Sequence, residues 1–228
     1  MDIQTNRLWA RLAAAAGLLT LAITAAFQML PQVTAAGACW APNKVLAFEL
    51  ARTAAQMLAV FGTAGDACRL PIVTAMDAVN TLDVWGYIPS YTAFGICAAI
   101  YLEGRVRQPL VLGAIGMAVV ALAGDYLETT TLLQITQAVD GSADLLWRSS
   151  LGAWIKFGAL AVHAFLLSRI CMAADTRRPI LAMLLLLPLA GTAFAGVDNS
   201  RSYLITGTFA LSWTPLLLVA LRDAVRRR

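Results

Sequence analysis

The sequence is dominated by long apolar runs of about 20 residues, separated by shorter stretches that carry charge. A helix rising 1.5 Å per residue crosses the roughly 30 Å hydrocarbon core of a bilayer in a run of that length. We place six such runs, at residues 8–30, 82–102, 109–135, 146–170, 179–197 and 202–221. The 228-residue chain is therefore predicted to be a single integral membrane domain (1–228), an all-α bundle of six transmembrane helices.

The composition supports a membrane protein and opposes a nucleic-acid-binding one. Hydrophobic residues make up 60% of the chain and charged residues only 13%, whereas about 25% of an ordinary soluble domain is charged. The net charge of +4 comes mostly from arginines at the ends of the apolar runs. Such arginines set the orientation of the helices. We therefore expect membrane lipids and no nucleic acid among the partners.

The distribution of basic residues predicts which side of the membrane each connection faces. Eleven of the 17 lysines and arginines fall on one side of a six-span arrangement, namely Arg7, Arg11, Arg105, Arg107, Arg169, Arg177, Arg178, Arg222, Arg226, Arg227 and Arg228. Because cytoplasmic connections are enriched in such residues, both termini are predicted to be cytoplasmic. The expected location is a bacterial inner (plasma) membrane.

The N-terminal run also has features of a signal peptide. Arg7 and Arg11 precede the apolar residues 12–30, and small residues follow at 35–39. The apolar region of a signal peptide is usually only 7–15 residues long, and further spans follow here. We therefore favour a first helix that is retained.

The connection 31–81 is too long for a simple turn, and its residues 42–61 are predicted to form one helix. Its polar residues Glu49, Arg52, Thr53 and Gln56 recur at i, i+3, i+4 and i+7, on one face. The helix would either lie as an amphipathic helix in the outer interface or re-enter the membrane and turn Glu49 and Arg52 toward the bundle.

Two of the four cysteines, Cys39 and Cys68, fall in this outer connection. An oxidising compartment outside the membrane would allow a disulfide between them. We favour this disulfide over the alternative that they are two unrelated small residues. No histidine lies nearby, and His163 is the only histidine of the chain. We therefore expect no metal site and no cofactor.

The strongest functional signal is a pair of carboxylates, Asp125 and Glu128, inside the apolar run 109–135. Ionised side chains there cost roughly 2.5–3.5 kcal/mol each, so they need a partner or a function. The run 146–170 supplies Arg148 and Lys156 on one helix face, and Lys156 should lie at about the depth of Asp125. Consecutive helices are usually adjacent and antiparallel. We therefore predict an Asp125–Lys156 contact and a Glu128–Arg148 contact.

The run 82–102 adds a second polar face. Asp83, Tyr87, Ser90 and Tyr91 recur at i, i+4, i+7 and i+8, which places them on one side of a helix. Pro89 lies among them and should kink the helix by removing a backbone donor. A cavity lined by hydroxyl groups is consistent with this pattern.

These charges admit a structural and a functional interpretation. Ion pairs that hold neighbouring helices in register would need no ligand. We favour a ligand-binding transporter or sensor, because more charge gathers in the outer half than register requires. A small or amphipathic ligand would be bound by Asp83, Tyr87, Tyr91, Asp125, Glu128, Arg148 and Lys156. In this hypothesis Arg148 and Lys156 hold an anionic group, and Asp125 carries a proton.

Two alternatives remain open. The first is an intramembrane enzyme that acts on a lipid or isoprenoid-like substrate, with Asp125 or Glu128 as general acid and Asp83 as base. The second is a structural or assembly subunit of a membrane complex, whose charges only hold helices together. The sequence leaves the oligomeric state and any protein partner open.

Overall fold

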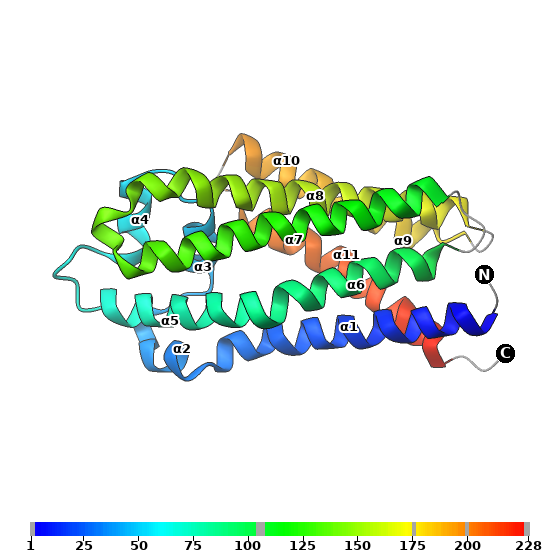
Figure 1. The fold of residues 1–228 in the computed structure, drawn as a ribbon, viewed down its shortest axis with the longest axis horizontal. Coiled ribbons are helices and arrows are strands. Elements are labelled where there is room, and N and C mark those ends of the chain that lie inside the picture. Colours follow the sequence, from blue (N-terminus) through cyan, green and yellow to red (C-terminus); the bar gives the residue numbers. More distant parts are fainter. Residues whose placement is uncertain (1–2, 104–107, 175–176, 199–200, 226–228) are drawn as a thin grey trace. The chain divides into compact units, whose positions relative to one another are not determined.

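A computed structural model describes residues 3–103, 108–174, 177–198 and 201–225, which are almost entirely helical (Figure 1). Helices account for 88% of the structure, and these described ranges contain no strand. The all-α prediction is confirmed. Arg105, Arg107 and residues 226–228, which contributed to the predicted topology, lie outside the described residues.

Four long helices carry most of the apolar sequence: α1 (Ile3–Met29), α7 (Gln108–Gln137), α8 (Leu146–Ala173) and α11 (Tyr203–Val225). Shorter elements connect them, namely α2 (Pro31–Ala36), η1 (Gly37–Cys39), α3 (Asn43–Glu49), α4 (Ala54–Phe61), α5 (Arg69–Leu82), η2 (Asp83–Tyr87), α6 (Ile88–Leu102), η3 (Val139–Gly141), η4 (Ala143–Leu145), α9 (Pro179–Leu184) and α10 (Leu187–Val197).

Five helical stretches are long and apolar enough to cross a membrane: Thr5–Cys39, Gln108–Gln137, Ala143–Ala173, Pro179–Val197 and Tyr203–Val225. The chain is therefore compatible with a multi-pass membrane protein. The predicted span at 82–102 is not among the five that the described residues provide. There the π-helical turn η2 interrupts the helix, and the surrounding sequence is rich in aromatic and hydroxyl side chains.

The chain forms two compact units. Unit 1 comprises Met1–Thr20, Ser90–Leu122 and Phe157–Arg228, and unit 2 comprises Leu21–Pro89 and Ala123–Lys156. The division falls within α1, α7 and α8, so each of these helices contributes to both units.

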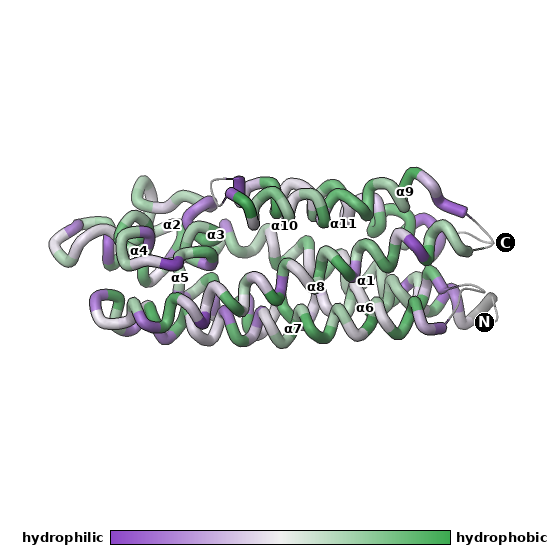
Figure 2. The backbone as a smooth tube through the Cα atoms, turned by 90° about the horizontal axis from the view of Figure 1, so that it is seen from above, coloured by the Kyte–Doolittle hydropathy of each residue, from purple (hydrophilic) through white to green (hydrophobic). Residues whose placement is uncertain are grey.

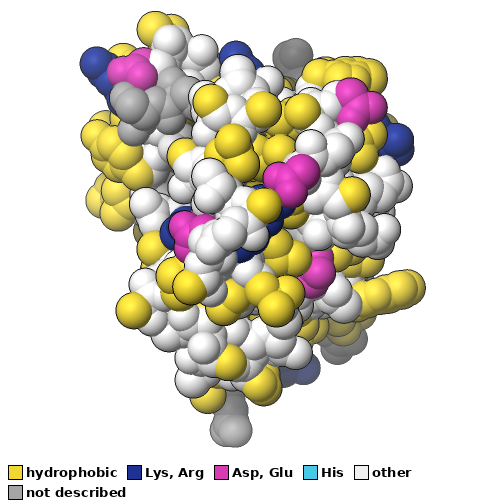
Figure 3. Space-filling model, turned by 90° about the vertical axis from the view of Figure 1, so that its left-hand side faces the viewer, with side chains coloured by type: hydrophobic (Ala, Val, Ile, Leu, Met, Phe, Trp, Pro, Cys, Tyr) yellow, Lys and Arg dark blue, Asp and Glu magenta, His cyan; other side chains and the backbone are white. Residues whose placement is uncertain are grey.

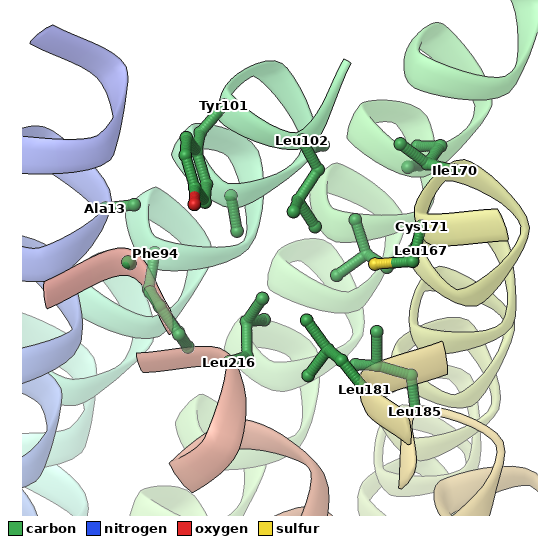
Figure 4. Packing of buried hydrophobic residues seen from close by; sticks show 14 of the residues in the cluster. Ala13, Phe94, Tyr101, Leu102, Leu167, Ile170, Cys171, Leu181, Leu185 and Leu216 are labelled. Carbon is green, nitrogen blue, oxygen red and sulfur yellow. The ribbon is translucent and has the colours of Figure 1, made fainter. Parts of the chain in front are cut away.

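Unit 1 is built around an apolar core with few polar side chains. Side chains from α1, α6, α8, α9 and α11 meet there, and Figure 4 shows Phe94, Leu167, Leu181 and Leu216 within this cluster. Phe94 packs edge-on against Trp213, with ring centroids 6.0 Å apart. Burial of large apolar side chains contributes roughly 1.5–3 kcal/mol each in water, but inside a bilayer close packing supplies most of the attraction between helices.

Unit 2 has a smaller apolar core beneath the connection between α1 and α5. Phe48 and Phe61 form an edge-to-face pair with centroids 4.7 Å apart, and Met76 and Leu132 are buried with them. Hydrophilic stretches gather around α3, α4 and α5, whereas α10 and α11 are mostly hydrophobic (Figure 2). Unit 2 therefore combines an apolar core with an unusually polar set of elements.

A disulfide joins Cys39 and Cys68, whose Cα atoms are 5.3 Å apart. The predicted bond is thus confirmed. It closes a loop that contains α3 and α4. Closing a loop of this length stabilises the fold by roughly 3–4 kcal/mol in the chain-entropy model.

The prediction of one helix over residues 42–61 is wrong, because the structure has α3 and α4 with a break between them. The Thr53 hydroxyl oxygen accepts from the Gln56 backbone N–H, and the Gln56 side-chain oxygen accepts from the Thr53 backbone N–H. This capping box starts a new helix at Ala54. The Thr-x-x-Gln pattern in the sequence was the signal for this break, and the side-chain periodicity obscured it.

Candidate functional site

The site is built on a backbone contact between α7 and α8 in unit 2 (Figure 1). A Cβ atom added to Gly152 would lie 2.6 Å from the Glu128 backbone nitrogen and 2.8 Å from the Gly124 carbonyl oxygen. A Cβ atom added to Gly124 would lie 2.7 Å from the Lys156 backbone nitrogen. The two glycines therefore allow the helices to touch, which brings the side chains beside them within ion-pair distance.

Lys156 lies against three carboxylates. Its Nζ atom is 2.5 Å from Glu128 Oε2, 3.1 Å from Asp125 Oδ1 and 3.5 Å from Glu49 Oε2. The Asp125 and Glu128 side chains are essentially inaccessible to solvent, at 2% and 0% exposure. The predicted Asp125–Lys156 contact is confirmed. Glu49 comes from α3 and joins the contact from the connection between α1 and α5.

A fourth carboxylate, Asp83, is linked to the same group through Thr129. The Thr129 hydroxyl is 3.0 Å from Asp83 Oδ2 and 3.4 Å from Asp125 Oδ1. About two turns further along, the Thr136 hydroxyl donates to Asp77. These two threonine–aspartate hydrogen bonds align α5 with α7 and place Asp83 beside Asp125. We call Lys156 together with Glu49, Asp83, Asp125 and Glu128 the Lys156 cluster.

The charges of the Lys156 cluster do not balance. Among the described residues, Lys156 forms ion pairs with three of these carboxylates, and the fourth, Asp83, joins them through Thr129. Both oxygens of the buried Glu128 carboxylate lack a hydrogen-bond partner of good geometry, although Lys156 lies against one of them. Burial raises the pKa of Glu49 despite the opposing effect of the Lys156 ammonium group.

The turn that carries Asp83 is π-helical. The Ile88 N–H donates to the Asp83 carbonyl, five residues back, instead of to Val84. The Val84 carbonyl therefore accepts from the Tyr126 hydroxyl of α7, at 3.2 Å. π-Helical turns are rare and are frequent at functional sites. The turn directly precedes Pro89, where a kink was expected from the missing backbone donor.

The structure brings some of the predicted site residues together and separates others. Asp83, Asp125, Glu128 and Lys156 meet in unit 2. Tyr87 also lies in unit 2, at the end of the π-helical turn, where its ring contacts Phe27 with centroids 5.6 Å apart.

Tyr91 belongs to unit 1 and packs against Trp213, with ring centroids 5.9 Å apart. The predicted shared face of Tyr87 and Tyr91 assumed a continuous α-helix. The π-helical turn adds a residue to one turn and so shifts the phase of the helix by about 100°.

Arg148 does not form the predicted pair with Glu128, whose cationic neighbour is Lys156. In the described part of the chain Arg148 is half-buried and has no ion pair. Glu128 is three residues from Asp125, so both carboxylates reach the same ammonium group once the glycines let the helices close. The sequence-based prediction matched residues only by their depth in the membrane, and it therefore paired each acid with a different cation.

Glu49 and Thr129 belong to the site but were not among the ligand-binding residues predicted from the sequence. Thr129 shares a helix face with Asp125, a spacing visible in the sequence. Glu49 lies 76 positions before Asp125, and no helix periodicity connects the two.

The surface at the α3–α5 end shows several separate acidic side chains with basic side chains beside some of them (Figure 3). Within the described residues, no group of three or more His, Cys, Asp and Glu side chains is arranged to hold a metal ion.

Comparison with models of known protein families gives no match, and neither curated proteins nor solved structures match the chain.

Proposed function

We propose that this chain is a multi-pass membrane protein that binds protons and a small cationic ligand at the Lys156 cluster, as a transporter or sensor. The observation that carries the proposal is the cluster itself. One ammonium group lies within 3.5 Å of two buried carboxylates and of the partly exposed Glu49 carboxylate, and a fourth carboxylate is one threonine away.

The charge imbalance supports proton binding. A buried carboxylate without a full counter-charge is costly in a low-dielectric environment, and such groups take up protons instead. One lysine neutralises one carboxylate, so the remaining acids require protons or a bound cation. A structural ion pair would need only one of these acids.

The Thr129 hydroxyl supports the same proposal. It has a single proton, yet it lies within hydrogen-bond distance of both Asp83 and Asp125. It can donate to one carboxylate only. The second contact is favourable when the other carboxyl group is protonated and donates to the hydroxyl oxygen.

The anion-binding role that the sequence suggested for Lys156 and Arg148 is not part of this proposal. Lys156 is already surrounded by carboxylates, and an added anion would be repelled by them. A ligand with an ammonium group instead complements the excess negative charge. The proposal keeps six spans, both termini in the cytoplasm and a bacterial inner membrane as the topology.

Infrared spectroscopy of the purified protein tests proton binding directly. Protonated carboxyl groups absorb above the amide I band, so the wild-type protein should show a band that Glu128→Gln removes in part. Asp144→Asn is the matched control, because Asp144 is exposed and lies outside the cluster. A spectrum without any such band across the neutral pH range would refute proton binding.

Proteoliposomes with an entrapped pH-sensitive dye test the coupling to a ligand. External choline or tetramethylammonium serves as a cationic probe that does not cross the lipid unaided. A coupled transporter should move protons when either probe is added, and Glu128→Gln should abolish the signal. A sensor should bind the probe with a change in its thermal transition and move no protons. If the probes cause neither proton movement nor a change in the thermal transition, the proposal of a cationic ligand is refuted.

An intramembrane enzyme is a second candidate, favoured by the arrangement of Asp83 and Asp125 on either side of one hydroxyl. A protonated and an ionised carboxyl group so linked can act as general acid and base. Incubation with bacterial lipid extract, followed by mass spectrometry, would reveal a product that Asp83→Asn does not form.

A further inference from the structure

Two uncharged polar side chains in the interior of unit 2 have polar atoms without a hydrogen-bond partner. They are Asn80 on α5, which is 3% exposed, and Ser149 on α8, which is 0% exposed. The Asn80 amide nitrogen and the Ser149 hydroxyl oxygen form no hydrogen bond with any described residue. Leaving a buried donor or acceptor without a partner destabilises a fold, so each such group requires an explanation.

Helix spacing places Asn80 between the apolar core of unit 2 and the Lys156 cluster. Met76, Asn80 and Asp83 recur at i, i+4 and i+7, so they lie on one side of the helical segment. Met76 is part of the buried apolar core, and Asp83 is part of the cluster. Asn80 is therefore an uncharged polar group at the boundary between apolar and charged side chains.

Ser149 occupies the equivalent place on α8. Leu146, Ser149 and Lys156 recur at i, i+3 and i+10, on one side of the helix. Leu146 is buried in the same apolar core of unit 2, and Lys156 is the centre of the cluster. Two helices thus show the same order of side chains, from apolar through uncharged polar to charged.

Asn80 and Ser149 also lie at similar distances from the carboxylates. Ser149 is three residues before Gly152, whose backbone meets α7 at Glu128, and three residues rise about 4.5 Å along a helix. Asn80 is three residues before Asp83, which corresponds to the same rise of about 4.5 Å. Both uncharged groups are therefore about one helical turn from an acid of the cluster, on the side of the apolar core.

We propose that the cationic ligand of the Lys156 cluster is a short amino alcohol, and that Asn80 and Ser149 bind its hydroxyl group. The inference rests on the proposed function, because it specifies the ligand of the same site. The ammonium group of the ligand lies beside Glu128, whose carboxylate oxygens lack well-oriented donors. Its hydroxyl group extends about one helical turn toward the apolar core.

The two side chains complement a hydroxyl group in particular. The Asn80 amide nitrogen can only donate, whereas the Ser149 hydroxyl group can donate and accept. A ligand hydroxyl group accepts from Asn80 and donates to Ser149, so it satisfies both atoms at once. A ligand carboxylate in this place would be repelled by the acids of the cluster. An alkylammonium ion would leave both side chains without a partner.

Ethanolamine and ethylamine are the matched probes, because both are ammonium ions at neutral pH and they differ by one hydroxyl group. Isothermal titration calorimetry of the purified protein in detergent measures both affinities. Ethanolamine should bind at least about tenfold more tightly, since ethylamine leaves the two buried polar atoms unpaired. In Asn80→Leu and in Ser149→Ala this preference should fall below about threefold.

The same two variants also give a measurement that does not depend on a ligand. Replacing an unpartnered buried polar group by an apolar group of similar size removes an unfavourable burial. The ligand-free variants Asn80→Leu and Ser149→Ala should therefore unfold at the same temperature as the wild type or at a higher one. Thr130→Val is the control, because Thr130 is exposed and its hydroxyl group bonds within α7. This control should keep the preference for ethanolamine.

Three results would overturn the inference. Equal affinities of the wild type for ethanolamine and ethylamine would do so while leaving the proposed cationic ligand in place. A preference that survives both substitutions, or a lower unfolding temperature in both ligand-free variants, would assign Asn80 and Ser149 to the fold alone. If neither amine binds, the amino alcohol and the cationic ligand are both refuted, whereas the infrared band still tests proton binding by itself.

Discussion

Each unit contains a group of interacting charged side chains, and the two groups differ in the ratio of cations to acids. In unit 1, Arg178 donates to the Tyr101 hydroxyl at 2.8 Å and to the Asp223 carboxylate at 2.7 Å. Tyr101 also donates to Asp223, and Arg222 contacts the other carboxylate oxygen at 2.8 Å. We call these four residues the Arg178 network. It joins α6 and α11 to the residue that precedes α9.

The Arg178 network has two cations for one acid, and each oxygen of that acid has a donor. The Lys156 cluster has one cation for four acids, and Glu128 lacks well-oriented donors. A network in which each carboxylate oxygen has a donor is sufficiently explained by a structural role, namely holding helices together. An excess of acids over cations costs stability and has no such structural role, which indicates a site kept for function.

The largest expected effect is that of removing the single cation of the Lys156 cluster. Lys156→Met leaves buried carboxylates uncompensated and should destabilise the protein by about 3–5 kcal/mol. Thermal unfolding in detergent measures the loss. The double variant Asp125→Asn/Lys156→Met should recover part of it, because the two groups interact directly. Additive losses would show that the pair is not coupled and would weaken the comparison.

A somewhat smaller effect is expected at the helix contact that creates the site. Gly152→Ala forces a methyl group against the backbone of α7 and should cost roughly 1–3 kcal/mol. Gly158→Ala on the same helix is the control, since nothing lies within 4 Å of its added Cβ atom. That control should be neutral or stabilising by up to about 1 kcal/mol. Equal thermal transition temperatures for the two variants would contradict the close backbone contact between α7 and α8 at Gly152.

Disrupting the Arg178 network should matter less. The Arg178 and Asp223 side chains are each 20% exposed, so water partly replaces a lost partner. Asp223→Asn should therefore destabilise by about 1 kcal/mol in thermal unfolding. The infrared carboxyl band assigned to the Lys156 cluster should be unchanged. A loss as large as that of Lys156→Met would erase the difference between the two groups.

The smallest effect concerns pH. Burial raises the pKa of Glu49, so the folded protein holds this proton more tightly than the unfolded chain does. The stabilisation from that proton is complete below the unfolded pKa and is lost as the pH rises through the raised folded pKa. The stability of wild type relative to Glu49→Gln should therefore fall as the pH rises above 4.5, the ordinary pKa of a glutamate side chain. The opposite slope would mean that the Lys156 pairing outweighs burial.

Counting along helices predicted the parts of this structure that depend on local periodicity. That Asp125 and Lys156 lie at the same depth follows from counting residues along two consecutive helices, and the structure contains the predicted contact. The Cys39–Cys68 bond follows from the shared location of two cysteines, and it too was found.

The remaining contacts depend on how the helices pack against one another. Glu128 pairs with Lys156 because the seam of glycines brings one long ammonium side chain within reach of two acids, so Arg148 was the wrong partner. The contribution of Glu49 depends on where α3 ends, at Glu49, before the Thr53 capping box starts α4. A single π-helical turn shifts the helix phase between Tyr87 and Tyr91, and propensity does not signal such a turn.

The glycine seam also defines what a related protein would have to share. Gly124 directly precedes Asp125 and lies four residues before Glu128, while Gly152 lies four residues before Lys156. Each glycine thus lies four residues, about one helical turn, before a charged residue at the α7–α8 contact. A pair of apolar helices with Gly-Asp-x-x-Glu on the first and Gly-x-x-x-Lys on the second would be a recognisable signature. Replacing either glycine would separate the helices and leave the charged residues of such a pattern without their common meeting point.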